Sequence, residues 1–464
     1  MKKPVTVKPE LMGGVRDMLP EEAIVFFDFV EKITGVYKKF GFVPLETPCM
    51  EKLPTLTGNI DDFDKSIFRT KVVKGMEDKS LKSSDLGEES ALRFDLTVPL
   101  ARVVSAYPEI PKPFKRYQLG KVFRGERPQA GRYREFYQLD FDIIGSSSLA
   151  ADLETIQIMY EVMKILEVDN FLIKFNSRKI LAGLADSLGE GDKIEEIIRI
   201  IDKLDKIGMD GVVADLQKSP GESSSGSALL NKEQAIKVKD FLEISRESKD
   251  IVGDLKTFFN GVSGLGMEGV LEIEYLANGL KNLGVQQKYW EIDLSVARGL
   301  GYYNGPVFEV ILKDLPGLGS VFSGGRYDGL TSRFIKNSNI GGVGASVGLD
   351  RLIVGLKQLG KINEKVSQSS VVVAVFNESL SQDSILVANE LRKADINTEV
   401  YLGSDTSLKN QIAYALKKNA KFVVIIGPDE KEQEKVQLKD LDARIQETIT
   451  MNECVKKIKK SVNK

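Results

Sequence analysis

The chain of 464 residues contains no histidine. Without imidazole side chains it cannot carry a Ser-His-Asp or Cys-His nucleophile, an imidazole proton shuttle or a histidine-ligated zinc ion. Cysteine is scarce as well, because Cys49 and Cys454 are the two in the chain. Their separation fits neither a disulfide framework nor a metal-ligand spacing. Chemistry in this protein therefore depends on arginine, carboxylates, tyrosine and bound ions, and the sequence identifies no metal site.

A strong net charge and long apolar runs are also missing. The formal net charge is −2, although 28% of the residues are charged. A polyanionic partner would therefore meet local basic patches instead of a basic surface overall. The N-terminus has no apolar core of signal-peptide type, and no apolar run reaches the roughly 20 residues that span a bilayer. These absences predict a soluble cytoplasmic protein without membrane attachment.

Hydrophobic periodicity changes along the first third of the chain. Residues 21–40 have helical spacing of apolar side chains, and Pro20 suits the start of a helix. Residues 91–145 alternate with period two between turn-forming segments, which predicts antiparallel strands. Helical spacing returns at residues 146–168. The pattern predicts a sheet flanked by helices.

The rest of the chain contains two further kinds of pattern. Residues 178–285 are dominated by charged helical segments, and strand patterns resume at 290–325 before a helix that begins near Leu349. We therefore expect a helical insertion between two halves of one sheet domain. After a polar linker near 360–369, strands alternate with helices, which predicts a small, largely parallel α/β domain.

Three segments of the predicted sheet each have one apolar face and one polar face. Successive side chains of a strand point to opposite faces. By this alternation the polar faces hold Arg93, Asp95 and Thr97, then Gln118, Arg124 and Glu126, and then Gln138, Asp140 and Asp142. A half-solvated sheet with its polar side in water would have the same pattern. Short or forked polar groups, in place of flexible lysine and glutamate, favour a fixed ligand.

Arginine is concentrated in the segment RGERPQAGRYREF, residues 124–136, which holds Arg124, Arg127, Arg132 and Arg134. A polar sheet that is rich in arginine and free of histidine indicates a phosphate ligand. Phosphoryl and nucleotidyl transfer need charge stabilisation and positioning more than acid or base groups. Exposure to solvent alone would also explain the charged residues at the tip of this hairpin.

Two glycine-flanked segments and one helix start carry further polar groups. The segments are ARGLGYYNGPVFE, residues 297–309, and SGGRYDGL, residues 323–330. Glycine allows a close approach of backbone to ligand, but a glycine turn between strands has the same composition. In GLDRL, Arg351 falls in the first turn of a helix, where a cation is slightly disfavoured. Either a bound anion or a salt bridge with Asp350 or Glu309 would explain it.

These motifs resemble a known family. FRGERPQAGRYREF and GLDRL are similar to motifs two and three of class II aminoacyl-tRNA synthetases, in which Phe-Arg-x-Glu is followed by a loop and Arg-x-x-x-Phe. ARGLGYYNGPVFE and SGGRYDGL resemble the two signatures of the histidyl-tRNA synthetase family. The similarity covers nearly the whole chain. It implies an α+β fold, with an antiparallel sheet flanked by helices, a helical insertion and a C-terminal α/β anticodon-binding domain.

The resemblance also implies an organisation and an activity. The expected regions are 1–178 and 288–362 for the two parts of the catalytic domain, 179–287 for the insertion and 369–464 for the anticodon-binding domain. The implied activity is ATP-dependent ligation of L-histidine to its tRNA through a histidyl-adenylate, with release of pyrophosphate and AMP. A cytoplasmic homodimer is implied, with Mg²⁺ accompanying ATP.

Site residues follow from the same resemblance. Arg124 and Arg298 are the expected catalytic arginines. The expected histidine-binding residues are Asp95, Leu96, Thr97, Arg124, Gln138, Asp142, Arg298, Tyr302, Tyr303 and Tyr327. The expected ATP-binding residues are Arg124, Glu126, Arg132, Phe136 and Arg351. Contacts to the acceptor end of tRNA are expected from Arg127 and Gln129.

The chain departs from the family pattern at three positions. Gly301 stands where many members have aspartate, Tyr137 replaces a common histidine, and Asp142 is shorter than the glutamate of many bacterial members. An alternative interpretation is a non-catalytic regulatory subunit of ATP phosphoribosyltransferase, which is similar to the catalytic core. Such subunits typically lack the arginines that hold ATP and the C-terminal domain, and both features are present here.

Overall fold

The computed structural model describes residues 7–58, 67–70, 89–128, 131–218, 228–297, 301–336, 338–362, 366–405 and 407–462. The chain divides into two compact units. One unit contains residues 1–16 and 29–361, and the other contains residues 17–28 and 362–464. Within the described ranges, no helix is both long enough and apolar enough to cross a membrane.

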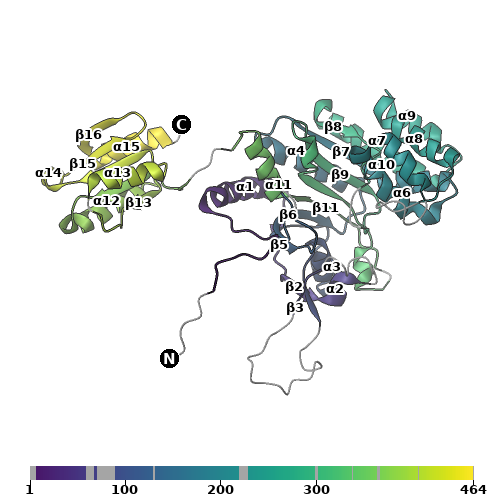
Figure 1. Cartoon of the computed structure of the whole chain (residues 1–464), viewed down its shortest axis with the longest axis horizontal. Coiled ribbons are helices and arrows are strands. Elements are labelled where there is room, and N and C mark those ends of the chain that lie inside the picture. Colours follow the sequence, from purple (N-terminus) through teal and green to yellow (C-terminus); the bar gives the residue numbers. More distant parts are fainter. Residues whose placement is uncertain are drawn as a thin grey trace, which may run out of the picture. The chain divides into compact units, whose positions relative to one another are not determined.

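A mixed sheet of eight strands is the centre of the first unit (Figure 1). Its order is β1-β5-β6-β11-β10-β9-β7-β8, with parallel pairs at both edges and antiparallel pairs between them. The strands are β1 (Val43–Pro44), β5 (Phe114–Phe123), β6 (Glu135–Ile144), β7 (Phe171–Ser177), β8 (Trp290–Ile292), β9 (Pro306–Leu312), β10 (Phe322–Arg326) and β11 (Gly342–Val347). The antiparallel pairing predicted within residues 91–145 is confirmed for the β5–β6 pair.

Helices cover this sheet where the periodicity predicts them. Helix α1 (Pro20–Lys39) begins at the predicted proline. Ser148 is the N-cap of helix α4 (Leu149–Ile165), and its side chain accepts a hydrogen bond from the Ala150 N–H. Helix α11 (Leu349–Gln358) directly follows β11. Arg351 therefore lies in the first turn of a helix, as predicted.

The segment ALRFDLT differs from its prediction as a continuous strand. The strand β4 (Ser90–Leu92) ends before Arg93 and belongs to a small sheet with β2 (Met50–Lys52) and β3 (Arg69–Thr70). Helix α3 (Thr97–Ala106) then begins at Thr97. Pro99 in the first turn suits a helix, and the Asp95 carboxylate accepts a hydrogen bond from the Val98 N–H at 3.1 Å. Strand alternation therefore does not apply across residues 93–97.

A cluster of helices follows β7 in the chain (Figure 1). The helices are α5 (Arg178–Ser187), α6 (Ile194–Ile201), α7 (Leu204–Gln217), α8 (Lys232–Glu247), α9 (Ile251–Phe259) and α10 (Gly264–Asn282). The helical character predicted for residues 178–285 is confirmed for these elements. Helices α5 and α10 approach closely at two glycines. A Cβ added at Gly183 would lie only 2.4 Å from the Gly266 Cα, so this contact requires a residue without a side chain.

The second unit contains a sheet of five strands in the order β13-β12-β14-β15-β16. The strands are β12 (Val371–Val375), β13 (Thr398–Val400), β14 (Phe422–Ile426), β15 (Lys435–Asp440) and β16 (Ile445–Thr450), and the helices are α12 (Ser381–Lys393), α13 (Leu408–Lys417), α14 (Pro428–Glu432) and α15 (Met451–Val462). The first three strands are parallel, as predicted. The strand pattern of KVQLKDL also predicts β15, which pairs antiparallel with β14 and β16, whereas β16 and α15 are further elements that were not predicted. Cys454 is buried in this core.

Candidate active site

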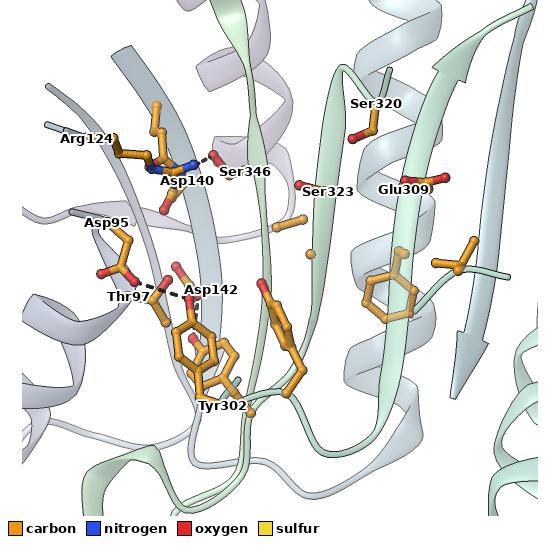
Figure 2. Close-up of a pocket in the computed structure, with 18 residues that line it drawn as sticks. Asp95, Thr97, Arg124, Asp140, Asp142, Tyr302, Glu309, Ser320, Ser323 and Ser346 are labelled. Atoms are coloured by element: carbon orange, nitrogen blue, oxygen red, sulfur yellow. Dashed lines mark hydrogen bonds between the residues drawn. The ribbon is translucent and has the colours of Figure 1, made fainter. Parts of the chain in front are cut away.

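A polar cavity of about 220 Å³ opens on the face of the large sheet (Figure 2). Segments that are distant in the sequence meet here: the loop before α3, the strands β6, β9, β10 and β11, and the loop that precedes β9. The lining residues are Asp95, Thr97, Arg124, Gln138, Asp140, Asp142, Val296, Tyr302, Tyr303, Phe308, Glu309, Ser320, Ser323, Gly324, Tyr327, Gly344, Ala345 and Ser346. The cavity therefore brings together eight of the predicted site residues.

The start of α3 forms one side of the cavity. Asp95 is buried, and the Tyr302 hydroxyl donates to its Oδ2 at 3.3 Å, as the dashed line in Figure 2 shows. Burial raises the pKa of Asp95, while the Val98 N–H and the nearby Arg124 act in the opposite direction. Thr97 lies beside this carboxylate in the first turn of α3. This side of the cavity offers a carboxylate and hydroxyls to a cationic group.

Two buried carboxylates of β6 form a second side. In the sheet register, Asp142 lies opposite Arg116 of β5 and Gly344 of β11. The Tyr327 hydroxyl donates to Asp142 Oδ1, and Arg116 Nη2 lies 2.6 Å from Asp142 Oδ2. Burial raises the pKa of Asp142, and Arg116 and Tyr327 counteract that rise. The Asp142 carboxylate is therefore held in one orientation.

Asp140 is the second of these carboxylates. Burial raises its pKa to about 7, Arg116 opposes this rise, and the negative charge of Asp142 adds to it. Gln138 lies on the same face and donates from Nε2 to Ser346 Oγ at 2.8 Å and to Asp140 Oδ1 at 3.3 Å. Strand alternation places Asp140 on the same face as Gln138 and Asp142, but the family resemblance assigns it no role.

Aromatic rings close the cavity near the carboxylates. The ring centroid of Tyr302 lies 5.0 Å from that of Tyr303 and 5.9 Å from that of Tyr327, and the centroids of Tyr303 and Tyr327 are 6.4 Å apart. Burial raises the pKa of all three phenols. Their hydroxyls therefore keep their protons at neutral pH and remain hydrogen-bond donors.

A second cavity of about 130 Å³ shares five lining residues with the first, namely Arg124, Gln138, Ser320, Ser323 and Ser346. Arg124 lies between two aromatic rings, with its guanidinium carbon 4.4 Å from the centroid of Phe94 and 5.1 Å from that of Phe136. Arg351 also lines this second cavity. Arg124 and Arg351 therefore border one space, as expected for groups that contact one anion.

Further residues of the second cavity fix the position of its arginines. Arg351 donates from Nη1 to the Ser320 carbonyl at 2.7 Å. Asp350, the neighbouring residue in α11, accepts a hydrogen bond from the Tyr137 N–H at 3.1 Å and forms an ion pair with Arg16. The first turn of α11 is thereby connected to β6 and to the N-terminal segment.

The hairpin between β5 and β6 places its arginines differently. Arg134 donates to the carbonyls of Glu126 and Gly13, both at 3.2 Å, so its contacts are structural. Arg132 pairs with Glu126 at 3.6 Å, and neither residue is among the described residues that line the two cavities. Arg127 is exposed. The cavities thus contain Arg124 alone of the four hairpin arginines.

One prediction on the segment before α3 needs correction. Arg93 was placed with Asp95 and Thr97, but its guanidinium turns away and donates to the carbonyls of Thr47, at 2.6 Å, and Lys121, at 2.7 Å. The reason is that the strand ends at Leu92. The side chain of Leu96 is fully buried and does not line the first cavity, and its expected contact with histidine stays a prediction.

Two predicted residues cannot be placed. Arg298, the second expected catalytic arginine, and Gln129, an expected tRNA contact, lie outside the described residues. Gly301 is exposed, and a Cβ at this position would have no heavy atom within 4 Å among the described residues. The roles of all these residues stay predictions.

Comparison with known proteins identifies the family. A family model described as histidyl-tRNA synthetase matches residues 14–352, and one described as anticodon binding domain matches residues 370–461. The chain belongs to the histidyl-tRNA synthetase family. It is 40% identical to a protein of Helicobacter pylori named histidine–tRNA ligase, over 95% of each chain. It is 39% identical to a protein of the same name from Clostridium tetani, over 99% of this chain and all of the relative.

Solved structures agree with this membership. The crystal structure of histidyl-tRNA synthetase from Nostoc sp. PCC 7120 matches with a TM-score of 0.84 and 33% identity, over 98% of this chain and 100% of the other. A Bacillus halodurans protein titled ATP phosphoribosyltransferase regulatory subunit/histidyl-tRNA synthetase matches with a TM-score of 0.70 and 21% identity, over 91% of this chain and 99% of the other. At this identity, the second match shows the fold alone. The predicted class II synthetase fold with a C-terminal anticodon-binding domain is confirmed.

Proposed function

We propose that this protein ligates L-histidine to its tRNA in the cytoplasm, using ATP and forming a histidyl-adenylate intermediate. Pyrophosphate leaves in the first step and AMP in the second. Membership of the histidyl-tRNA synthetase family supports this activity. The observation that carries the proposal is the polar cavity, which gathers carboxylates, phenols and an amide next to Arg124.

The first cavity is the proposed pocket for histidine. Asp95, Thr97 and Gln138 would bind its α-ammonium group, which suits the carboxylate and hydroxyls on that side. Asp142 and Tyr303 would bind the imidazole, with further contacts from the tyrosines at 302 and 327. An imidazole offers two ring nitrogens, so a carboxylate and a phenol can engage both. Amino acids without such a ring would leave these buried groups unpaired, which penalises their binding.

The second cavity is the proposed nucleotide site. Arg124 would hold the ATP α-phosphate, and Phe136 would stack on the adenine, in keeping with their places in this cavity. Arg351 would bind the distal phosphates. Arg132 is assigned to the same phosphates and Glu126 to the adenine amino group by family resemblance. Magnesium would enter with ATP, coordinated by the phosphates as part of the substrate.

The chemistry of adenylation suits the side chains of the chain. The histidine carboxylate attacks the α-phosphorus, and the bond to pyrophosphate breaks. Arg124 on one side, and Arg298 on the other by resemblance, would stabilise the negative charge that develops. No proton has to be transferred in this step, so an enzyme without histidine side chains can perform it. In the second step a ribose hydroxyl at the tRNA terminus attacks the adenylate.

Contacts with macromolecules are proposed on the same basis. Arg127, which is exposed, and Gln129 would contact the acceptor end of the tRNA. The C-terminal unit would bind the anticodon region. A homodimer would form through the first helix and the strand after it. Val43 in β1 and Met50 in β2 are large apolar side chains with exposed fractions of 48% and 56%, which supports an interface there.

Amino-acid-dependent exchange of labelled pyrophosphate into ATP tests the activity. With each of the twenty amino acids in turn, histidine alone should support exchange. Arg298→Ala should abolish most of the exchange with little change in ATP binding. A regulatory subunit of ATP phosphoribosyltransferase, the alternative function, would bind histidine without any exchange, and that result would overturn the proposal.

A further inference from the structure

Arg116 is a fully buried arginine to which neither the resemblance nor the proposed mechanism gives a role. Its side chain has no exposed surface, and it is absent from the lining of the first cavity. It lies on β5 directly opposite Asp142 of β6 in the sheet register. A guanidinium without access to solvent requires specific partners to offset its desolvation.

The partners of Arg116 belong to opposite ends of the proposed histidine pocket. Its Nη2 lies 2.6 Å from Asp142 Oδ2, at the end proposed for the imidazole. The same nitrogen donates to the Leu96 carbonyl at 3.2 Å. Leu96 stands between Asp95 and Thr97, at the end proposed for the α-ammonium group. One buried side chain therefore connects the two groups of ligand contacts.

The charges around Arg116 explain why its position matters. Asp140 and Asp142 are both buried on the neighbouring strand, and the positive charge of Arg116 lowers the pKa of each against the effect of burial. The other groups that act on these carboxylates are Asp95 from the loop before α3, which raises both pKa values, and Tyr327 and Ser346, which donate hydrogen bonds. Among the residues that the structure describes, Arg116 is thus the cation that most favours the ionised forms of both carboxylates.

Three further charged or titratable side chains face the same carboxylates. Arg124 comes from the end of β5, Tyr303 from the loop before β9, and Tyr37 from α1 on the other face of the sheet. Burial raises the pKa of both tyrosines, so they stay neutral over the pH range in which the carboxylates titrate.

We propose that Arg116 is a positioning residue for histidine recognition, which fixes the Asp142 carboxylate for the imidazole and connects it to the backbone that carries Asp95 and Thr97. This role rests on the proposed function. An ionised Asp142 can accept a hydrogen bond from a ring N–H, whereas a protonated one loses acceptor capacity. Loss of Arg116 would remove a positive charge that stabilises both ionised carboxylates, so the pKa values of Asp140 and Asp142 would rise further.

The substitution Arg116→Gln tests this role. Glutamine keeps a donor for the Leu96 carbonyl but removes the charge. The exchange reaction is measured at about pH 6 and about pH 9, because more of Asp142 would carry a proton at the lower pH. We expect the KM for histidine in the exchange reaction to rise roughly tenfold or more at the lower pH, as the loss of a hydrogen bond to a charged group would cause. The increase should shrink at the higher pH, and the KM for ATP should stay within about twofold at both.

Two further variants make the test specific. Arg116→Lys keeps the charge but loses the forked geometry, so it should raise the KM for histidine by a smaller factor without the pH dependence. Arg93→Gln is the matched control, because Arg93 is equally buried but donates to oxygens of Thr47, Pro48 and Lys121 within the described part of the chain. It should lower the melting temperature without a pH-dependent change in the KM for histidine.

The outcomes separate this role from the function on which it rests. A wild-type protein without histidine-dependent exchange would refute the proposed function. If the wild type exchanges, but Arg116→Gln leaves the KM for histidine unchanged or alters kcat and both KM values equally at every pH, the positioning role is wrong. If Arg116→Gln does not fold, Arg116→Lys becomes the test. A rise in its KM for histidine, with an unchanged KM for ATP, supports the positioning role. A KM for histidine equal to that of the wild type refutes it.

Discussion

At the scale of single residues, the site depends on how a few buried polar groups are paired. Asp142 is the clearest case, since Tyr327 and Arg116 each contact one of its oxygens. A buried carboxylate without such partners would take up a proton. The proposed recognition of an imidazole by Asp142 therefore depends on these neighbours as much as on the carboxylate itself.

The substitution Tyr327→Phe tests the contact with the other oxygen of Asp142, the one that Arg116 does not contact. It removes the hydroxyl that donates to Asp142 Oδ1 but keeps the ring. The KM for histidine should rise by roughly 10- to 150-fold, because a hydrogen bond to a charged group contributes about 1.5–3 kcal/mol. Pyrophosphate exchange at varied histidine measures it. Tyr160→Phe is the control, because the Tyr160 ring packs against Tyr289 away from the cavity, and a similar effect there would contradict the prediction.

At the scale of secondary structure elements, glycine on β11 makes room for the site. A Cβ at Gly344 would lie 2.3 Å from Asp142 Oδ1 and 2.4 Å from the Phe141 carbonyl oxygen. Because the second of these atoms belongs to the backbone of β6, a rotamer change cannot relieve the overlap. The glycine-rich composition of β11 is thus a requirement of the close packing between β6, β11 and the carboxylate.

Gly344→Ala should therefore damage stability and histidine binding together. We expect a loss of about 1–3 kcal/mol in the free energy of unfolding, typical of overpacking in a core. Urea denaturation measures the first effect and the KM for histidine the second. Gly317→Ala serves as the control, because a Cβ there meets no described heavy atom within 4 Å. Equal stability of both variants would show that the overlap is relieved at no cost.

The elements also show how far the sequence predicts this site. Motif residues such as Arg124, Gln138 and Asp142 were predicted to share a face, and the cavity gathers them. The prediction was wrong at Arg93, because β4 ends at Leu92 and α3 begins at Thr97, where alternation indicated one continuous strand. The partner of Asp142 was not predicted, since the pairing of Arg116 with it depends on the register between β5 and β6. Periodicity does not encode that register.

At the scale of the whole molecule, the absence of histidine simplifies the dependence of stability on pH. Between about pH 5 and pH 8, histidine normally dominates titration. Here the buried carboxylates take that place. Burial raises the pKa of Asp140 to about 7 and that of Asp152 to about 6. In the unfolded chain both return to ordinary values near 4, so the folded state binds more protons in this range.

Stability should consequently fall as the pH rises. For a carboxyl group whose pKa is raised in the folded state, the contribution is complete below the unfolded pKa and is lost as the pH rises through the folded pKa. Urea unfolding should give a smaller free energy at pH 8 than at pH 5. Asp140→Asn removes one of these groups. The difference in the free energy of unfolding between pH 5 and pH 8 should therefore be smaller in the variant by on the order of 2–4 kcal/mol. An identical slope in the variant would contradict the assignment.

The proposed dimer is a second property of the whole molecule. Val43→Asp places a charge on the exposed apolar surface of β1, where desolvation of the carboxylate would oppose association. Sedimentation should show a dimer for the wild type and a shift towards monomer for the variant. Substitution of Leu402, which is 84% exposed in the C-terminal unit, is the control and should leave the dimer intact. A monomeric wild type would refute the proposal.

In the proposed mechanism, side chains from separate segments converge on a nucleotide and on an amino acid with an imidazole ring. A crystal structure of the protein with histidine and a non-hydrolysable ATP analogue is the decisive measurement. We expect the ring nitrogens within hydrogen-bond distance of Asp142 and Tyr303, and the α-phosphate against the guanidinium of Arg124. A ring bound away from Asp142, or phosphates bound away from Arg124 and Arg351, would contradict it.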